Sequence, residues 1–238
     1  MTSILVTRPE GQTSTTVRTL GDMGLNAIVR PLTRVEPVDF ELNYEPAAVV
    51  VTSVNGALHG LNRIANKSTR VYTVGKRTAE VVREMGFDIV IDGDGTAKSI
   101  LGLVHTFQQS VGGTIVHLSG ETLAHDVVAD LTGAGYTAHR QVCYETHRLD
   151  LTQEDMDTFQ QAKISWVVFY SATALTIFEE EVGKFGATPE SLGLSAHCLS
   201  ERIKAASAQP WKGLTAAPYP EEFSLLASMK RMIENGGL

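Results

Sequence analysis

Residues 5–32 read LVTRPEGQTSTTVRTLGDMGLNAIVRPL and residues 116–143 read VHLSGETLAHDVVADLTGAGYTAHRQVC, and the two segments align at an offset of 111 positions. Leu20 then stands opposite Leu131, and Gly24 opposite Gly135. Each segment is typical of a buried strand, a helix that ends at a glycine, and a second strand. Because this strand–helix–strand unit occurs twice, the sequence predicts a repeated α/β architecture.

Three further matches follow in the same order along the chain. VVVTSVNGAL at 49–58 aligns with VVFYSATALT at 167–176 at an offset of 118, and VYTVGKRTAEVV at 71–82 aligns with AHCLSERIKAAS at 196–207 at an offset of 125. TAKSILGLV from Thr96 resembles YPEEFSLLA from Tyr219, and both indicate the start of a helix. Each match is degenerate by itself, but four matches in one order indicate two similar α/β lobes.

Short β-branched runs alternate with helical patterns almost from end to end. Apolar residues recur at helical spacing at Val81, Val82 and Met85, for example. Helices that alternate with buried strands predict a parallel sheet covered on both faces. The expected strands are Ser3–Thr7, Ala47–Thr52, Val71–Val74, Asp88–Ile91, Thr114–Leu118, Ser165–Tyr170 and Ser195–Leu199.

Two segments, PLTRVEPV at 31–38 and VCYETHRL at 142–149, have the pattern of extended chain. If the chain leaves the first lobe at one of them and returns at the other, the second lobe is an insertion. We therefore expect a discontinuous first lobe at 1–33 and 148–238 and an inserted second lobe at 38–142. The segments 34–37 and 143–147 would form a two-stranded linker that acts as a hinge.

Composition narrows the class of protein. At 238 residues the chain is long for one compact domain and sufficient for two, and its hydrophobic fraction of 43% allows a sizeable core. Cys143 and Cys198 both lie in apolar runs, which is typical of buried thiols in a reducing compartment. The opening MTSILVTRPEG has no pattern of a secretory signal, and no run approaches the roughly 18 apolar residues that cross a bilayer. We therefore expect a cytoplasmic protein without a membrane span.

The formal net charge is −7, and the sequence contains no cluster of lysine and arginine residues. A basic stripe is the usual mark of a nucleic-acid partner, so this class of partner is disfavoured.

Hydroxyl groups and glycines recur where expected strands end. Carboxyl ends of parallel strands face the binding crevice, and helix N-termini there offer N–H groups for carboxylates or phosphates. The alternative is that these residues only cap helices, a role that serine and threonine often fill. The five strand ends, each expected to lead into a helix, are Thr7-Arg8-Pro9, Thr52-Ser53-Val54-Asn55-Gly56, Gly75-Lys76-Arg77-Thr78, Ser119-Gly120-Glu121 and Tyr170-Ser171-Ala172-Thr173.

Other patterns point to ordinary structure. Asp92-Gly93-Asp94-Gly95-Thr96 lacks the third glycine of a dinucleotide fingerprint and is better interpreted as a turn. Glu121 and His125 are four apart on an expected helix, but no third ligand lies nearby, so we expect no metal. His117 and His197 fall within strands and are interpreted as core or crevice histidines.

Several short motifs, taken in order, resemble those of uroporphyrinogen-III synthases over essentially the whole chain. The motifs are Ile4-Leu5-Val6-Thr7-Arg8-Pro9, Val51-Thr52-Ser53, Val74-Gly75, Ser119-Gly120-Glu121, Val142-Cys143-Tyr144-Glu145-Thr146, Phe169-Tyr170-Ser171 and Pro218-Tyr219-Pro220. The resemblance implies two α/β lobes with an active-site cleft between them. It also implies a lyase reaction without cofactor, in which hydroxymethylbilane loses water and closes to uroporphyrinogen III with its last pyrrole ring inverted.

The substrate that the resemblance implies is a linear tetrapyrrole with eight carboxylates, and we expect the protein to be a monomer. A chain of net charge −7 repels such an anion at long range, so helix N-termini and hydroxyls would have to bind it locally. Because the substrate also cyclises unaided to the wrong isomer, the enzyme would act chiefly by orienting it.

The resemblance places a tyrosine, Tyr144, at the edge of the linker, facing the cleft. We expect its phenol to donate a hydrogen bond to the departing hydroxyl and to help expel it as water. The alternative is that Tyr144 only packs against the hinge. The residues expected to bind substrate are Thr7, Arg8, Thr52, Ser53, Gly75, Thr78, Ser119, Gly120, Ser171 and Ser200.

The chain departs from the family pattern in the second half. Ser200 and Ile203 stand where the first half has Gly75 and Thr78, so the role of a threonine there is in doubt. A non-catalytic two-lobed small-molecule sensor of the same fold remains the alternative function.

Overall fold

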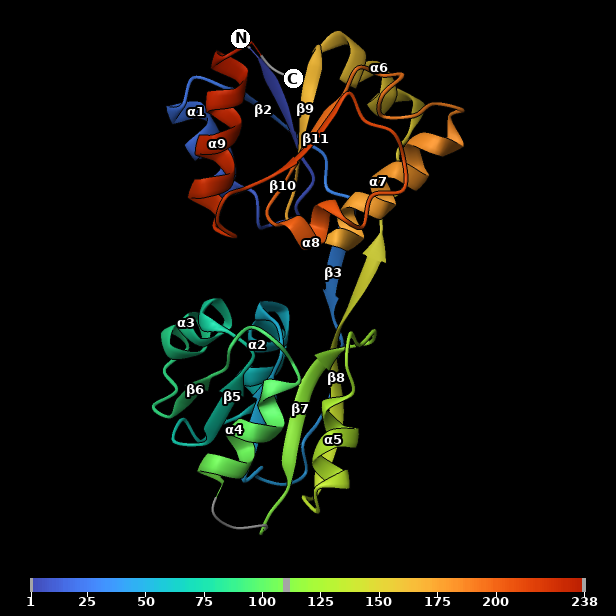
Figure 1. Ribbon diagram of the computed structural model, residues 1–238. Coiled ribbons are helices and arrows are strands. Elements are labelled where there is room, and N and C mark those ends of the chain that lie inside the picture. The colour runs from blue at the N-terminus through green and yellow to red at the C-terminus, as the bar shows by residue number, and fades with distance from the viewer. Residues whose placement is uncertain (1, 109–111, 237–238) are drawn as a thin grey trace. The chain divides into compact units, whose positions relative to one another are not determined.

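The computed structural model describes residues 2–108 and 112–236, and the chain forms two compact units (Figure 1). Unit 1 comprises Met1–Arg34 and His147–Leu238, and unit 2 comprises Val35–Thr146. Each unit is an α/β layer structure, so the predicted fold class of two lobes with mainly parallel sheets is confirmed.

The sheet of unit 1 has five parallel strands in the order β11-β10-β9-β1-β2. Strands β1 and β10 are buried along their whole length and β9 at all but one residue, as expected for a sheet covered on both faces. The bounds are β1 Ser3–Val6, β2 Asn26–Val29, β9 Ile164–Phe169, β10 Ser195–Cys198 and β11 Gly213–Ala216.

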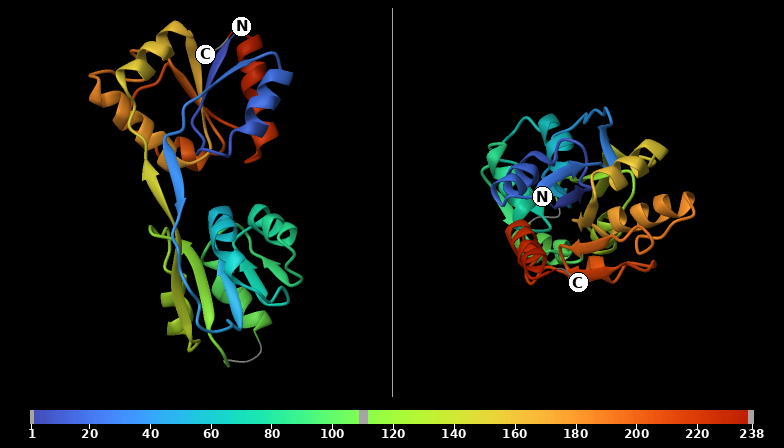
Figure 2. Two further views of the ribbon diagram at one scale, coloured as in Figure 1. Left: turned by 180° about the vertical axis from the view of Figure 1, so that it is seen from behind. Right: turned by 90° about the horizontal axis from the view of Figure 1, so that it is seen from above.

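Helices cover both faces of this sheet, as Figures 1 and 2 show. On one face Leu20 and Leu225 pack against Ile4, and on the other Phe178 packs in a second apolar cluster with Phe169. The first face carries α1 Ser14–Asp22 and α9 Glu222–Glu234, and the second carries α6 Gln153–Gln161, α7 Ala172–Lys184 and α8 Glu201–Lys204.

The sheet of unit 2 has the order β3-β8-β7-β4-β5-β6. The bounds are β3 Thr33–Pro37, β4 Ala48–Val51, β5 Arg70–Thr73, β6 Val90–Asp92, β7 Ile115–Gly120 and β8 Ala138–Arg148. One face is covered by α2 Val54–Gly60 with the 3₁₀ turn Leu61–Arg63 and by α3 Lys76–Glu84, and the other by α4 Ser99–Phe107 and α5 Val127–Gly133.

Strands β3 and β8 are the two segments in which the chain crosses between the units. The Val38 amide donates to the Cys143 carbonyl, and the Leu149 amide donates to the Leu32 carbonyl, both at 3.0 Å. From Leu32 to Val38 the bonded partner moves back along the chain, from Leu149 to Cys143, so β3 and β8 run antiparallel. The linker is therefore two-stranded, as the predicted fold class requires.

The sheet registers confirm the internal repeat. Val6 pairs with Val168 in unit 1, and His117 pairs with Val50 in unit 2, which preserves the offsets of 111 and 118. His197 likewise pairs with Val168, and Tyr72 with Val50, which preserves the offset of 125. The two sheets therefore correspond strand by strand, from β2-β1-β9-β10-β11 in unit 1 to β8-β7-β4-β5-β6 in unit 2.

Two of the five expected helix starts are wrong. After Thr7 the chain turns, with Gln12 donating to the Pro9 carbonyl and Gly11 at a φ of +78°, and α1 begins only at Ser14. After Ser119 the strand β7 continues to Gly120, because that residue still pairs with β8.

The helix expected at Glu121 and His125 is also wrong. Helix α5 begins at Val127, and the side chain of Asp126 caps it. Glu121 and His125 therefore precede the helix and do not share a helical face.

Strands β2 and β11 were not among the expected buried strands. The residues of β11 are partly buried, and those of β2 are partly buried or exposed, because each strand lies at an edge of the sheet. The glycines at 24 and 135 follow their helices with φ of +76° and +88°, which confirms the predicted C-caps.

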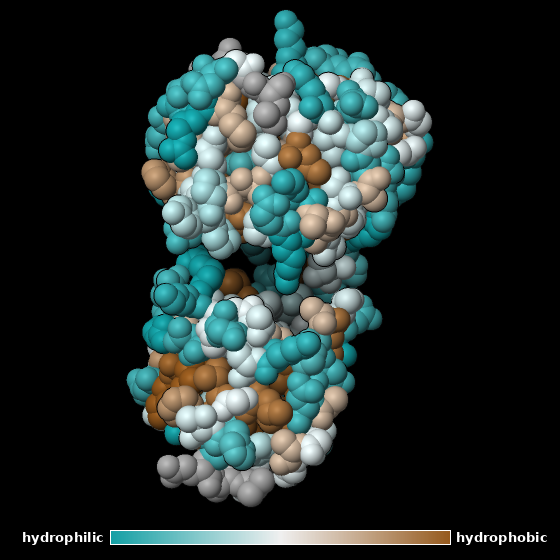
Figure 3. Space-filling view, in the orientation of Figure 1, coloured by the Kyte–Doolittle hydropathy of each residue, from teal (hydrophilic) through white to brown (hydrophobic). Residues whose placement is uncertain are grey.

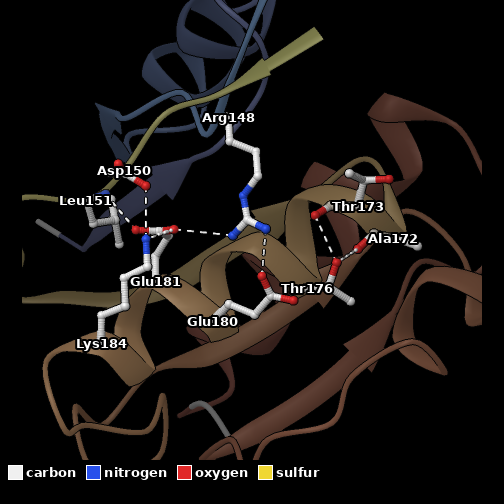
Figure 4. A network of polar contacts seen from close by, with 9 residues as sticks. All are labelled: Arg148, Asp150, Leu151, Ala172, Thr173, Thr176, Glu180, Glu181 and Lys184. Carbon is white, nitrogen blue, oxygen red and sulfur yellow. Dashed lines mark hydrogen bonds and ion pairs between the residues drawn. The ribbon is translucent and has the colours of Figure 1, made fainter. Parts of the chain in front are cut away.

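A buried carboxylate ties the end of β8 to α7 within unit 1 (Figure 4). Glu181 is fully buried and accepts hydrogen bonds from the Leu151 amide at 3.1 Å, Arg148 Nη2 at 3.2 Å and Lys184 Nζ at 2.7 Å. Arg148 also pairs with Glu180 at 2.7 Å. The contacts fix the strand where the chain re-enters unit 1.

The units differ in surface hydropathy on the face drawn in Figure 3. Unit 1 is mostly hydrophilic there, whereas hydrophobic side chains gather over α4 and β6 of unit 2. Ile91, Leu101 and Leu103 are partly buried at the rim of the apolar cluster on that side. These three side chains at the edge of the cluster therefore remain partly exposed to solvent.

Candidate functional site

In unit 2 the structure brings together three of the predicted site residues, Ser53, Gly120 and Tyr144. Ser53 follows β4 and caps α2, because its Oγ accepts a hydrogen bond from the Gly56 amide at 3.0 Å. The same Oγ lies 3.0 Å from the Tyr144 hydroxyl oxygen. A serine from one strand end and a tyrosine from β8 therefore form one polar pair.

Gly120 provides the space for the Tyr144 ring. It pairs with Tyr144 across β7 and β8, at a register irregularity. A Cβ atom at Gly120 would lie 2.6 Å from Tyr144 Cζ and 2.9 Å from its hydroxyl oxygen, closer than van der Waals contact permits. The glycine was predicted as a binding residue, and its visible role is to let the phenol lie across the strand.

Thr52 is the next hydroxyl at this edge, and it contacts a buried histidine. Its Oγ1 lies 3.2 Å from His117 Nε2. Burial, with a smaller contribution from the charge of Arg140, lowers the pKa of His117 to about 4. Among the described residues, no group bonds the buried His117 Nδ1. The imidazole is therefore neutral near pH 7 and only partly satisfied.

Ser119 is fully engaged within unit 2. It is buried, its Oγ accepts from Arg140 Nε at 2.9 Å and donates to the Gly120 carbonyl at 3.1 Å. Arg140 Nη2 also donates to the carbonyls of Gly120, at 2.6 Å, and of Glu121. Arg140, which the sequence analysis missed, thus fastens the end of β7.

Gly75 and Thr78 belong to the start of α3. Gly75 is the N-cap with extended backbone, and a Cβ there would lie 3.6 Å from Gly95 Cα in the loop after β6. That loop is the predicted turn, in which Gly95 has a φ of +98°. Thr78 is a buried residue in the first turn of α3.

In unit 1 the predicted hydroxyls have mainly structural contacts. Thr7 is buried and its Oγ1 donates to the Val168 carbonyl at 3.1 Å. Ser171 caps α7 by accepting from Ala174 at 3.1 Å, and Ser200 caps α8 by accepting from Ile203 at 3.4 Å. Ser171, Ser200 and, in unit 2, Ser53 therefore have the helix-capping role that was the alternative to substrate binding.

Arg8 is the predicted residue in unit 1 with charged partners. Its Nη1 donates to Glu222 Oε1 at 3.0 Å, and Tyr170 donates to the same oxygen at 3.0 Å. Neither Glu222 nor Tyr170 was predicted. Tyr170 lies beside the predicted Ser171, but no sequence pattern connects Arg8 with a glutamate 214 positions away.

Two hollows lie away from these strand ends. A cavity of about 270 Å³ is lined by Ile164 and Leu194 at the amino ends of β9 and β10. Another of about 300 Å³ is lined by Pro46 and Thr69 before β4 and β5. The carboxyl ends are the candidate site, because ligands of parallel α/β sheets bind there and because the Ser53–Tyr144 and Arg8–Glu222 pairs lie there.

The described residues contain no group of three or more His, Cys, Asp and Glu side chains placed to hold a metal ion. Nor does any described helix have the length and apolar character to cross a membrane.

A family model matches most of the chain. Residues 14–227 match the family model described as uroporphyrinogen-III synthase HemD. No curated protein sequence matches the chain significantly.

Solved structures give the fold. The chain is similar to uroporphyrinogen-III synthetase from Helicobacter pylori, at 14% identity over 98% of this chain and 100% of that one, with a TM-score of 0.66. It is also similar to a mutant uroporphyrinogen III synthase from the extremely thermophilic bacterium Thermus thermophilus, at 15% identity over 99% and 100% of the chains, with a TM-score of 0.62. With the family model matched over most of its length, the chain belongs to the uroporphyrinogen-III synthase family.

Proposed function

We propose that the chain acts as a lyase: it removes water from hydroxymethylbilane and closes the ring to uroporphyrinogen III, with the last pyrrole inverted. The observation that carries the chemical proposal is the pair of Ser53 and Tyr144, 3.0 Å apart over Gly120. Family membership supports the overall reaction, and the geometry of this pair supports a role for the phenol.

The hydrogen-bond pattern leaves the phenol proton available. Ser53 Oγ accepts the Gly56 amide, so its own hydrogen can be donated to the Tyr144 oxygen. Tyr144 then has its proton free to donate to the hydroxyl of the substrate. As the carbon–oxygen bond breaks, that donation helps the hydroxyl leave as water, and the carbon that bore it bonds the substituted α carbon of the last pyrrole. The existing methylene bridge then leaves that carbon and bonds the free α carbon of the same ring, which inverts the ring, and the proton that this carbon loses restores the Tyr144 phenol.

Substrate binding follows from the accessible groups at the strand ends. We propose that Thr52, Ser53, Gly75, Ser171 and Ser200 bind carboxylates through hydroxyls or through N–H groups at helix starts. Thr7, Thr78 and Ser119 are buried, so their part is to shape these ends. Gly120 makes room for Tyr144, and Arg8 supplies a cation.

Most of the acceleration would come from orientation. The substrate cyclises unaided to the other isomer, so binding must favour the folded conformation in which inverted closure is nearest. Catalysis of this kind requires one proton donor and many groups that bind the substrate. The described strand ends offer Tyr144 as the donor and several hydroxyls and N–H groups for binding.

We propose further that the protein is a cytoplasmic monomer. Cys143 and Cys198 are free thiols, and burial raises the pKa of each to about 12, so both stay protonated and unreactive in a reducing compartment. Light scattering on the purified protein tests the monomer.

The decisive assay supplies fresh hydroxymethylbilane and separates the I and III isomers of the product. We expect more isomer III than forms without the protein. A product that consists of isomer I alone would indicate the non-catalytic alternative. A folded Tyr144→Phe protein should form isomer III at least ~10²-fold more slowly in a single turnover. Tyr136→Phe, a matched change just before the amino end of β8, should leave the rate unchanged.

A near-normal rate in Tyr144→Phe would remove the phenol from the mechanism and leave catalysis to orientation alone.

A further inference from the structure

Arg8, Glu222, Tyr170 and Thr16 form a half-buried cluster at the carboxyl edge of unit 1. Arg8 Nη1 donates to Glu222 Oε1 at 3.0 Å and to Thr16 Oγ1 at 3.3 Å. Tyr170 donates to the same Glu222 oxygen at 3.0 Å, and the Thr16 hydroxyl contacts it too. One carboxylate oxygen therefore collects the contacts of Arg8, Tyr170 and Thr16.

The plane of the Arg8 guanidinium is also fixed. Its Cζ lies 4.3 Å from the centroid of the Tyr170 ring, within the range of a cation–π contact. Tyr170 in turn is held by Glu222, and burial raises the pKa of its phenol well above the usual range. The phenol therefore stays protonated and remains a donor to Glu222.

Of the three guanidinium nitrogens of Arg8, Nη1 donates to acceptors. Within the described residues, no acceptor bonds the other two nitrogens, Nε and Nη2. These two nitrogens lie on one edge of the guanidinium, and together they match the two oxygens of a carboxylate. The side chains of Arg8 and Glu222 are 22% and 31% exposed, so this edge is accessible but not fully hydrated.

We propose that Glu222 and Tyr170 are positioning residues that hold Arg8 for a bidentate contact with one carboxylate of the substrate. The inference rests on the proposed function for the identity of that carboxylate. Glu222 anchors Nη1 and Tyr170 supports the plane, so Arg8 meets the ligand with its Nε and Nη2 edge already oriented. Orientation before binding lowers the side-chain entropy lost in the complex.

The ion pair could instead serve only to dock α9 against α1, which lie side by side on one face of the sheet (Figure 1). The two roles differ in their effect on substrate binding. A docking role would lower thermal stability on substitution and leave KM unchanged in folded protein. A positioning role would raise KM with little effect on kcat, since the contact forms outside the reacting bond.

Matched substitutions distinguish the contribution of the Arg8 charge to substrate binding from the contributions of its bidentate edge and of the residues that orient it. Arg8→Lys keeps the charge and loses the edge, and Glu222→Ala loses the anchor, so each should raise the KM for hydroxymethylbilane about 10-fold, the usual loss of a charge-assisted contact. Glu222→Gln keeps an acceptor oxygen and should hold KM within about 2-fold of wild type. Tyr170→Phe keeps the ring but loses the Glu222 contact, and should give an intermediate KM.

Arg231→Ala is the control for net charge. Arg231 is exposed in the last turn of α9, at the other end from Glu222, so removing it should leave KM unchanged. Wild-type KM in folded Arg8→Lys or Glu222→Ala proteins would overturn the inference, and so would an equal rise in Arg231→Ala.

A second readout separates this inference from the proposed function. Fluorescence titration with uroporphyrin III, which carries eight carboxylates, measures binding without turnover. If the wild type forms no isomer III but binds this probe, and Arg8→Lys and Glu222→Ala weaken binding about 10-fold, the function is wrong and the inference holds. If the wild type forms isomer III and the variants bind and turn over normally, the inference alone fails. Absence of both activity and binding in the wild type would overturn both.

Discussion

The carboxyl edges of the two units share one backbone frame and differ in chemistry. The sheet registers make Arg8 of unit 1 equivalent to Ser119 of unit 2, and Tyr170 equivalent to Thr52. Unit 1 therefore has a cation, an aromatic ring and a carboxylate partner where unit 2 has two hydroxyls. Ser53 and Ser171 are equivalent and identical, and both cap a helix.

The difference indicates a division of labour within a duplicated fold. Unit 1 presents a positive charge with two nitrogens that no described acceptor bonds, which suits an anionic ligand. In unit 2 the cation at the edge, Arg140, already bonds Ser119 and two carbonyls, and the groups that contact Tyr144 are neutral. A protein of net charge −7 gains from a local cation where carboxylates bind. Neutral donors suit a departing hydroxyl, because a phenol can give a hydrogen bond without the cost of burying charge.

The largest expected effect in unit 2 comes from Gly120→Ala. The new Cβ would lie 2.6 Å from Tyr144 Cζ, so the ring has to turn away and the pair with Ser53 is lost. The Gly120 backbone is not in the left-handed region, so alanine adds no backbone strain there. We expect single-turnover formation of isomer III to fall by about 10²-fold, the size of the Tyr144→Phe loss.

Gly102→Ala is the matched control, because a Cβ at Gly102 meets no atom within 4 Å. It should keep full activity. Wild-type turnover in a folded Gly120→Ala protein would mean that the position of the phenol does not matter, and unit 2 would lose its distinct role.

Much of the frame could be predicted from the sequence, and the partnerships within the site could not. Buried β-branched runs mark β4, β7 and β9, because strands covered on both faces are mainly apolar. Ser53 and Tyr144 were each singled out, but their contact joins positions 91 apart and follows from the sheet order.

The Arg8 cluster illustrates why the rest was out of reach. Arg8 and Glu222 meet because α1 and α9 lie on the same face of the sheet, which the local sequence does not encode. The helix expected after Thr7 failed for a local reason instead, since the turn from Pro9 to Gln12 intervenes before α1.

The buried histidines give the next largest effect, one in each unit. Burial lowers the pKa of His117 and of His197 to about 4, from 6.5 in the unfolded chain. Below pH 6.5 the unfolded chain takes up a proton that the folded chain refuses, so stability is complete above pH 6.5 and declines as the pH falls toward 4. Each histidine should cost about 2–3 kcal/mol at pH 4.5.

Hydrogen exchange followed by mass spectrometry measures the decline in each unit separately. His117→Val places in unit 2 the residue that unit 1 has at the equivalent position, Val6. It should flatten the decline in peptides from β4 and β7 and leave those from β9 and β10 unchanged, where His197 still bonds Thr215 and Ser228. An unaltered decline in unit 2 would assign its acid sensitivity to other groups.

The smallest effect tests a position at which the two edges are identical. Ser53→Ala and Ser171→Ala each remove a cap, from Gly56 at 3.0 Å and from Ala174 at 3.1 Å, so each should lower stability by about 1 kcal/mol. Of the two serines, Ser53 is the one that also contacts Tyr144. At saturating substrate, Ser53→Ala should therefore lower turnover roughly 5-fold, the worth of one neutral hydrogen bond, and Ser171→Ala should not.

A double substitution shows whether that loss passes through the phenol. If Ser53 acts by orienting Tyr144, Ser53→Ala adds nothing once Tyr144→Phe has removed the hydroxyl, and the two effects are not additive. If the losses add in full, Ser53 contacts the substrate independently. Equal losses of turnover in Ser53→Ala and Ser171→Ala would contradict the division between the units, because the same cap would then have the same function at both edges.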